Sequence, residues 1–457
     1  MVYAPLALPW LLAAGLAALD GRRRSVGWVA AGTLTVHLAA LAWLGLDVFL
    51  DGPRETVTGG WPAGIGIVLR ADALGVAFAF VSSLVLLLAL VYELQSGGSS
   101  RTFPALVLFL AAGLTGLFLT GDVFSFFVFF ELSMMASYVL SAHGGEARQL
   151  GAAFIFAVVN LLGSFVFLIS VAAIYHVTGT LEMAAVAERM TLVEPASAIA
   201  IAVSVFVAFG VKLGLFPFHF WLPPIYAGAR PAVAAILSGA VANIGAYGLL
   251  RFGAGLLPLE LELTAGALAV LGAASIVYGS AQALSRRATA EVLAYSSIGQ
   301  AGYILVALAV GGRVGYAAAV VYAVANSLNK VLLFLAAGAR GPLVGGAFAL
   351  GALSVVGLPP SGGFVAKVEL FLAGLEAGSA VLVALIVVGS LLSFVYMFQI
   401  YQHDYWRARP AEPASRTSVR LLVFAVALLV LAAGVWPEPL LLLGERCADV
   451  LLAEGGG

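Results

Sequence analysis

The chain consists of long apolar runs separated by short polar segments. Most of these runs exceed about 18 residues, the length at which an apolar stretch indicates a membrane-spanning helix. The alternation over about 10 residues that is typical of transmembrane barrel strands is not seen. The pattern therefore predicts an all-α polytopic membrane protein with about fourteen spans. The expected spans are 3–20, 26–50, 68–92, 102–120, 122–142, 149–177, 196–222, 231–254, 261–285, 290–311, 313–339, 343–375, 379–402 and 418–443.

Two of these spans are interrupted by proline and glycine. The seventh reads FGVKLGLFPFHFWLPP from Phe209, and the twelfth reads GLPPSGGFVAKVEL from Gly357. Proline removes a backbone donor and clashes with the preceding turn, so both helices should break. Broken backbone at membrane depth persists only where it faces protein or a wet cavity, and a pair of such segments is typical of inverted-repeat transporters. The alternative is that the prolines only kink two packed helices.

The breaks also suggest how the chain is divided. They lie five spans apart, and an odd offset gives two repeats of opposite orientation across the membrane. We expect an N-terminal three-helix segment (1–100), a first inverted repeat of spans 4–8 (101–255) and a second of spans 9–13 (256–402). A loop and helix 14 (403–457) would complete the chain.

Composition supports the membrane class and excludes others. Hydrophobic residues make up 62% of the chain, charged residues 10%, and the mean hydropathy is +1.08. Soluble domains are about half apolar and about a quarter charged, so a soluble enzyme and a disordered chain are excluded. A formal net charge of −1 leaves no basic surplus for nucleic acid. The single cysteine, Cys447, excludes an internal disulfide and a cysteine-based cluster or zinc site.

The distribution of basic residues predicts orientation, because Lys and Arg collect in cytoplasmic loops. Loops after even-numbered spans hold few arginines: Arg54, Arg189, Arg251 and Arg313. Loops after odd-numbered spans hold many: Arg22, Arg23, Arg24, Arg101, Arg148, Arg230, Arg286, Arg287, Arg340, Arg407, Arg409, Arg416 and Arg420. We therefore expect both termini outside, the N-terminal run to be a retained first span, and a bacterial or archaeal cytoplasmic membrane as the location.

Four charges lie within apolar runs, namely Glu131, Lys212, Lys330 and Lys367. An ionisable residue at the bilayer centre costs on the order of 3 kcal/mol unless it is paired or hydrated. Burial disfavours the charged form of a lysine, and a nearby carboxylate favours it. Moving Glu131 relative to Lys212 would thus make the lysine hold or release a proton, which an arginine cannot do. The alternative is structural ion pairing or snorkelling.

Other polar residues are weaker candidates. His219 follows the break in span 7 and is either a proton relay or a structural histidine bonded to loosened backbone. Asn243 either belongs to a water chain or makes an interhelical hydrogen bond. Asp72 and Asp122 stand at the starts of spans and are expected to be helix caps. No Walker loop, HExxH or GxSxG motif is present, so we expect no cofactor, no metal and no catalytic centre in this chain.

Four segments resemble one family in the order in which that family has them. They are DVFSFFVFFE at Asp122–Glu131, KLGLFPFHFWLP at Lys212–Pro223, NSLNKVLLFLAAG at Asn326–Gly338 and GLPPSGGFVAK at Gly357–Lys367. The chain resembles the antiporter-like subunits of respiratory complex I, membrane-bound hydrogenases and Mrp-type cation/proton antiporters. With the fourteen spans, the resemblance covers essentially the whole chain, and it is strongest for the middle-sized members such as the D-type subunit of Mrp antiporters.

The resemblance implies roles for individual residues. Glu131 and Lys212 match the glutamate and lysine of an ion-pair switch, and His219 matches the histidine after the broken helix. Lys330 matches the central position of span 11, and Lys367 the lysine of span 12 where protons exit. Many members also have a lysine in span 8, before a G-x-Y-x-L-x-R pattern. Here that pattern is Gly245–Arg251, and the lysine position is Asn243.

The leading hypothesis is a subunit of a multisubunit Na⁺ or K⁺/proton antiporter, conducting protons through two linked half-channels beside other membrane subunits. A second is a proton-pumping subunit of a redox-driven complex, in which the chain would be part of a translocase. A third is an energising subunit of an inorganic-carbon uptake complex, and a fourth is a non-transporting scaffold. The expected partners are membrane subunits, protons, a monovalent cation and lipid, without nucleic acid.

Overall fold

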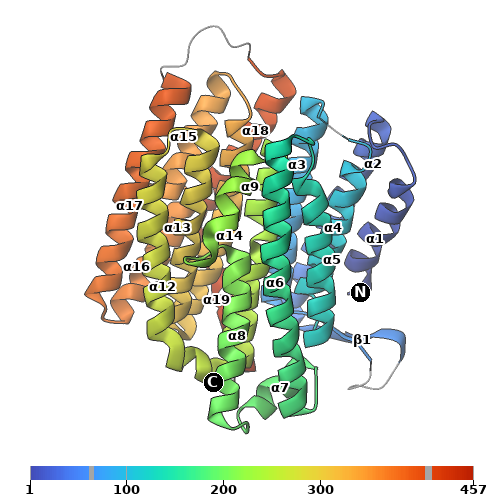
Figure 1. Cartoon of the computed structure of the whole chain (residues 1–457), viewed down its shortest axis with the longest axis vertical. Coiled ribbons are helices and arrows are strands. Elements are labelled where there is room, and N and C mark those ends of the chain that lie inside the picture. Colours follow the sequence, from blue (N-terminus) through green and yellow to red (C-terminus); the bar gives the residue numbers. More distant parts are fainter. Residues whose placement is uncertain (1, 61–65, 99, 407–413, 456–457) are drawn as a thin grey trace.

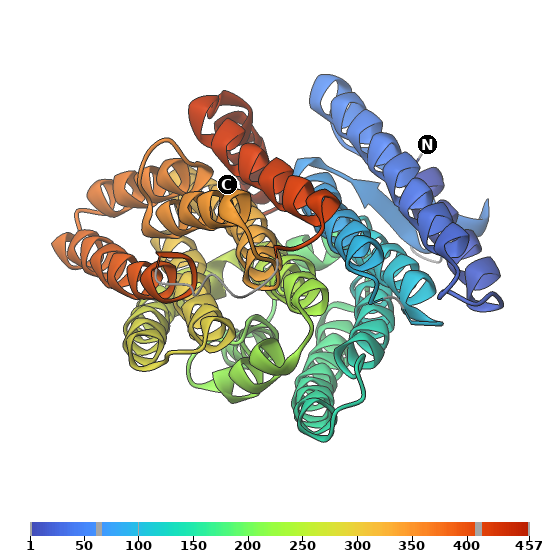
Figure 2. The same cartoon turned by 90° about the horizontal axis from the view of Figure 1, so that it is seen from above.

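The computed structural model of the protein describes residues 2–60, 66–98, 100–406 and 414–455. Its helices run roughly side by side along one axis, and seen from above they form an elongated bundle (Figures 1 and 2). The helices are α1 (Tyr3–Ala17), α2 (Arg24–Asp51), α3 (Ala73–Ser96), α4 (Phe103–Phe118), α5 (Val123–Ser141), α6 (Ala147–Thr178), α7 (Met183–Met190), α8 (Pro195–Leu213), α9 (Leu222–Gly228), α10 (Pro231–Ile236), α11 (Asn243–Gly248), α12 (Pro258–Ser285), α13 (Thr289–Val310), α14 (Gly312–Ala337), α15 (Pro342–Val356), α16 (Gly362–Glu376), α17 (Ala380–Tyr401), α18 (Thr417–Val435) and α19 (Glu438–Glu454). Short 3₁₀ or π-helical segments are η1 (Thr58–Gly60), η2 (Phe218–Trp221), η3 (Leu237–Val241), η4 (Leu249–Leu256) and η5 (Gln402–Trp406).

The expected spans are present. In the described part of the chain, 11 helical segments are long and apolar enough to cross a membrane. The shorter apolar helices α1, α4 and α15 stand where spans 1, 4 and 12 were expected. Asp72 and Asp122 cap α3 and α5 as predicted, accepting from the backbone N–H of Gly75 and Ser125.

Both predicted breaks are confirmed. In span 7, α8 is followed by Gly214, and in span 12, α15 is followed by Gly357, with φ of 71° and 87° respectively. This left-handed conformation favours glycine and stops a helix. In span 7, the indole Nε1 of Trp221 donates to the carbonyl oxygen of Val211 at 3.0 Å, which satisfies a carbonyl that the break leaves free.

Span 14 differs from the expected single helix over 418–443. It ends at Val435, and α19 begins at Glu438 after Trp436 and Pro437. Proline lacks the N–H that a continuing helix needs and fits the first turn of a new one, so the chain restarts at this point. The second helix runs on to Glu454.

Two features were not predicted: a β-hairpin, whose second strand takes up the start of the expected third span (68–92), and the short helix α7. Strands β1 (Arg54–Val57) and β2 (Val68–Ala71) form an antiparallel hairpin, with Glu55 opposite Arg70, and α7 follows α6. Figure 1 shows the hairpin projecting near the lower end of the bundle. The Tyr3 hydroxyl donates to Val57, and Glu454 pairs with Arg70, so both ends of the described chain lie toward the hairpin.

Burial separates interior from peripheral spans. The most apolar windows of α14 and of the span over 231–256 are 89% and 94% buried, whereas those of α12, α17 and α18 are 28% buried. The interior span over 231–256 contains two π-helical segments, η3 and η4, on either side of α11. Charged side chains on these interior spans are therefore surrounded by tightly packed helices.

The order of elements repeats. Spans 4–8 run from α4 to η4 and spans 9–13 from α12 to η5, and the fourth span of each set is the broken one. Five spans reverse the direction of the chain, so the second set crosses the bundle oppositely to the first. This agrees with the predicted inverted repeat.

Candidate functional site

The first part of the candidate site lies between α5 and α8. Lys212 is in the last turn of α8 and is 4% exposed, and Glu131 is a half-buried residue of α5. The Lys212 Nζ lies 4.1 Å from the centroid of the Phe130 ring and within electrostatic reach of Glu131. In the described residues, no carboxylate oxygen stands within 4.0 Å of this nitrogen. The structure thus brings the two predicted residues near each other without direct contact.

The Lys212 ammonium faces a small internal pocket. Trp221 and Tyr226, which follow the break, and Asn160 of α6 share its lining. Neither the Lys212 Nζ nor the Asn160 Oδ1 has a hydrogen-bond partner in the described part of the chain. A buried donor and a buried acceptor that lack partners are costly unless water or a moving proton satisfies them. The break in span 7 therefore leaves a buried lysine amine and a buried amide oxygen without hydrogen-bond partners among the described residues.

Lys330 stands in the middle of the core. It is 1% exposed on α14, and its Nζ has no hydrogen-bond partner among the described residues. The amide oxygens of Asn326 and Asn329 on the same helix are also without a partner in that part of the chain. The second lysine is thus an isolated buried cation flanked by free acceptors.

Asn243 joins three helices. Its Nδ2 donates to the Ser82 hydroxyl of α3 and to the carbonyl oxygen of Gly239, each at 3.0 Å. Its Oδ1 accepts from the Ser327 hydroxyl of α14, also at 3.0 Å. Ser327 lies one turn before Lys330. Both amide hydrogens are therefore used, and Asn243 forms an interhelical hydrogen-bond junction beside the central lysine.

Lys367 lies just after the break in span 12, on α16. Its Nζ donates to the carbonyl oxygen of Val356 at 3.1 Å and to the Ser390 hydroxyl of α17 at 2.8 Å. Val356 is the last residue of α15, where free carbonyls and the helix dipole attract a cation. A pocket that borders Lys367 opens between α16 and α17. The third lysine is thus held by one hydrogen bond to the broken span and one to the neighbouring α17.

His219 takes a peripheral position. On η2, its ring stacks on Phe216 and lies 4.4 Å from the Tyr278 ring of α12, measured between centroids. Its Nδ1 has no hydrogen-bond partner in the described residues. Its neighbour Phe220 is 58% exposed. The structure therefore places His219 at the surface of span 7, against the second repeat.

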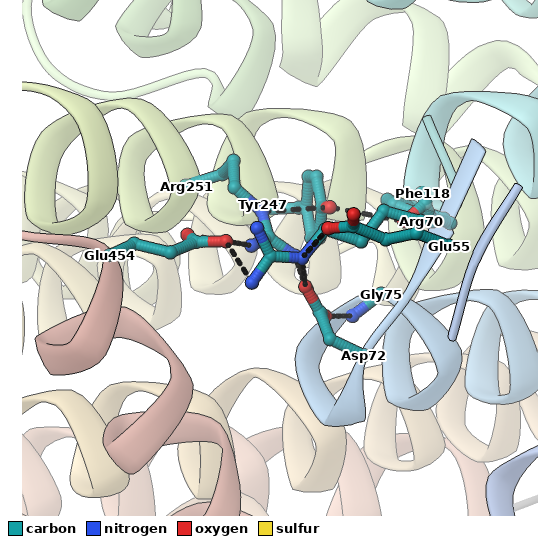
Figure 3. Close-up of polar contacts among 8 residues, drawn as sticks. All are labelled: Glu55, Arg70, Asp72, Gly75, Phe118, Tyr247, Arg251 and Glu454. Carbon is teal, nitrogen blue, oxygen red and sulfur yellow. Dashed lines mark hydrogen bonds and ion pairs between the residues drawn. The ribbon is translucent and has the colours of Figure 1, made fainter. Parts of the chain in front are cut away.

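A second buried charge cluster was missed by sequence reasoning (Figure 3). Arg251 is 3% exposed in η4 and was assigned to a loop, which is wrong. Its guanidinium donates to both oxygens of Asp72 at 2.8 and 2.7 Å and to both oxygens of Glu454 at 2.7 Å. Its Nε donates to the Tyr247 hydroxyl at 3.0 Å. An arginine inside an apolar run carries the same signal as the three lysines, and that signal would have found it.

The hairpin extends this cluster. Arg70 of β2 lies 3.2 Å from Glu454, 3.6 Å from Asp72 and 3.5 Å from Glu55 across the hairpin. Asp72 thus caps α3 and also pairs with two arginines. Residues of β1, β2, η4 and α19 are joined in one network at the end of the bundle where both termini lie.

The lysine sites and the arginine network use different basic residues. The chain has three lysines, at 212, 330 and 367, and its remaining 19 basic residues are arginines. All three lysines are buried in spans and have no carboxylate within 4.0 Å in the described residues. No group of three His, Cys, Asp or Glu that could hold a metal ion is found in the described ranges. The buried lysines and the buried arginine therefore differ in whether a carboxylate compensates their charge.

Comparison with known proteins gives consistent results. Residues 120–393 match the family described as NADH:quinone oxidoreductase/Mrp antiporter, TM. The chain is 36% identical over 256 residues to the D-type subunit of a Na⁺/H⁺ antiporter from Alkalihalophilus pseudofirmus. The aligned part is 55% of this chain and 52% of that relative, so the chain spans about half the length of this relative.

Two further matches cover nearly the whole chain. The D-type subunit of a Na⁺/H⁺ antiporter from Bacillus subtilis is 30% identical over 434 residues, which are 89% of this chain and 87% of that one. A chain in the structure of the Mrp complex from Dietzia sp. DQ12-45-1b superposes with a TM-score of 0.90 at 27% identity. That match covers 99% of this chain and 97% of the other.

Proposed function

Because the chain belongs to the NADH:quinone oxidoreductase/Mrp antiporter family of membrane proteins, we propose that it is a proton-translocating subunit of a multisubunit Na⁺ or K⁺/proton antiporter. The observation that carries this proposal is the use of lysine. A chain with 19 arginines keeps its three lysines for buried positions inside spans. Arginine stays charged in proteins, whereas a buried lysine can lose its proton.

The first step would take place at Lys212. With Glu131 close, the carboxylate stabilises the ammonium, and the lysine holds its proton. When α5 or the broken span 7 shifts and separates the two groups, desolvation dominates and the proton leaves. The present geometry, in which the groups are near but not in contact, supports a pair that a small movement can strengthen or weaken.

Lys330 and Lys367 would continue the path in the second repeat. The proton would pass from Lys212 to Lys330 and leave through Lys367, whose ammonium bonds to the break in span 12. These positions correspond to two half-channels, one per repeat, that meet at the interior spans. Neighbouring membrane subunits would move the cation or contribute the rest of its path.

A second candidate function shares the same pathway. The family description includes NADH:quinone oxidoreductase, in which the same pathway would be driven by electron transfer in other subunits. The named relatives are antiporter subunits, which favours the first candidate. With either energy source, the driving reaction would take place in partner subunits.

The experiment uses the chain together with its partner subunits in inverted vesicles. A pH gradient is imposed and followed with a pH-sensitive dye while Na⁺ or K⁺ is added. We expect cation-dependent dissipation with the wild type and less than about a tenth of its rate with Lys212→Ala or Glu131→Gln, because either change removes one half of the pair. Dissipation without any cation dependence, but gradient formation when an electron donor is added, would favour the redox candidate.

Lys212→Arg is the discriminating control. It keeps the positive charge and most of the volume but cannot release a proton. If Lys212 only needed to be cationic, this variant would transport like the wild type, and the proposed proton release would be wrong. Equal amounts of each variant in the membrane, measured by immunoblot, separate lost transport from lost folding.

A further inference from the structure

An apolar groove opens between α2 and the interrupted span 14, and none of the three lysines lines it. Its walls are α2 and α3 on one side and α18 with α19 on the other, and Val324 and Leu328 of α14 form its floor. It encloses about 950 Å³. Because the lining is almost entirely aliphatic or aromatic, the groove fits the acyl part of an amphiphile.

The length of the groove matches one leaflet. Along α3 it extends from Ala73, beside the hairpin, to Leu84. At about 1.5 Å per residue this is about 16 Å, roughly half of a 30 Å hydrocarbon core. On α2 the lining begins at Leu41, so residues 24–40 of that helix are not part of it. A transmembrane helix of a partner would need a groove through the whole bilayer, which this one does not provide.

The end of the groove near the hairpin carries a positive charge. Arg446 of α19 is exposed, lines the groove and holds its guanidinium 5.0 Å from the centroid of the Phe49 ring. The adjacent acids Glu445 and Asp449 pair with Arg313 instead. No carboxylate in the described part of the chain lies within 4.0 Å of Arg446. Glu438, the acid of the lining, begins α19 eight residues away, about 12 Å along the helix.

We propose that this groove binds one phospholipid of the leaflet on the hairpin side. Its acidic headgroup would meet Arg446, and its acyl chains would lie against α2, α3 and α14. An exposed arginine that has no carboxylate within 4.0 Å in the described residues, at the end of an apolar groove, is complementary to an anionic lipid. The lipid would fill the space between α2 and the interrupted span 14, beside the direct packing of α3 on α18 and α19.

The test measures lipid retention on the full chain with its partner subunits. The protein is exchanged into detergent with equal phosphatidylglycerol and phosphatidylcholine, and bound lipids are counted by native mass spectrometry. We expect Arg446→Gln to lower phosphatidylglycerol retention about fivefold relative to phosphatidylcholine, the effect of removing one basic residue near a membrane surface. Arg22→Gln, an exposed arginine at the other end of the bundle, should change nothing.

Two more variants test the apolar part. Ala42 is exposed and lines the groove, so Ala42→Trp should exclude both lipids without disturbing the core. A photoreactive p-benzoylphenylalanine in place of Leu46 should form adducts with lipid. Equal phosphatidylglycerol retention in wild type and Arg446→Gln would overturn the headgroup assignment, and an adduct with a partner polypeptide at position 46 would overturn the lipid itself. Neither readout depends on transport, so the lipid proposal is tested independently of the proposed function.

Discussion

At the scale of single residues, the identity of each buried cation follows from its partners. Arg251 faces two carboxylates and a tyrosine hydroxyl, and its planar fork meets both acids in bidentate pairs. Lys212 and Lys330 have no such acceptors in the described residues. A permanent charge needs compensation, whereas an amine can shed its charge. Arginine is therefore used where two carboxylates compensate the charge, and lysine where none does among the described residues.

Asn243 is predicted to be a structural junction. Asn243→Ala removes hydrogen bonds among α3, α11 and α14, and interhelical bonds of this kind contribute about 0.6 kcal/mol each on average. We expect a loss of about 1 kcal/mol in stability, seen as a lower thermal midpoint of the purified protein. Transport per folded molecule should be unchanged, because both amide hydrogens are already donated.

A matched variant separates this role from proton relay. Ser238→Ala removes a hydroxyl of the same span whose bond goes to Ala234 of its own helix, and it should leave the midpoint nearly unchanged. If Asn243→Ala abolished transport while its thermal midpoint stayed at the wild-type value, Asn243 would belong to the proton path instead.

At the scale of elements, the arginine network holds α19 in place. Glu454 in the last turn of α19 binds Arg251 and Arg70, so this helix is tied to η4 and to the hairpin at once. Cys447 is fully buried on the same helix, and it is the chain's single cysteine. Access of a reagent to its thiol therefore reports whether α19 has opened.

Arg251→Gln is predicted to release α19. The change leaves Asp72 buried without its closest cation, and breaking a buried pair costs about 3 kcal/mol or more. If opening of α19 becomes easier by about 3 kcal/mol, labelling of Cys447 should accelerate by roughly a hundredfold. Maleimide modification of Cys447, followed by peptide mass spectrometry over time, measures this rate.

Arg313→Gln provides the control for that experiment. Arg313 also ties α19 to α14, through Asp449 at 2.7 Å, but its side chain is 51% exposed. Exposed pairs contribute at most about 1 kcal/mol, so the labelling rate should change less than about fivefold. Equal rates in the two variants would show that the buried network does not hold α19.

The elements that the sequence predicted are those with a local cause. Pro217 and Pro359 act on their own helices, so both breaks could be predicted. Pro437 is also evident in the sequence, but the apolar run continues past it to Leu443, so the end of α18 at Val435 was not predicted. The hairpin and the Arg251 network depend on partners up to 203 residues away in the chain, which no local pattern contains. In the candidate site, burial cost identified the lysines, but their distances depend on how helices pack.

At the scale of the whole molecule, the arginine-rich loops and the Arg251 network lie at opposite ends of the bundle. The arginine-rich loops contact one another: Gly21 donates to Arg101, Arg230 to Gly98 and Ser415 to Arg340. Arg407 and Arg409 lie outside the described residues. The hairpin, both ends of the described chain and the Arg251 network lie at the opposite end.

Orientation in the membrane is the last prediction. If basic loops face the cytoplasm, the hairpin end faces outward. Thr191, between α7 and α8, and Ser285, before α13, are exposed at opposite ends, and buried Cys447 should react slowly. A membrane-impermeant maleimide should label Thr191→Cys in right-side-out vesicles and Ser285→Cys in inverted ones, with both labelled in detergent. The reverse pattern would place the arginine-rich loops outside, so the proposed path from Lys212 to Lys367 would cross the membrane in the opposite direction.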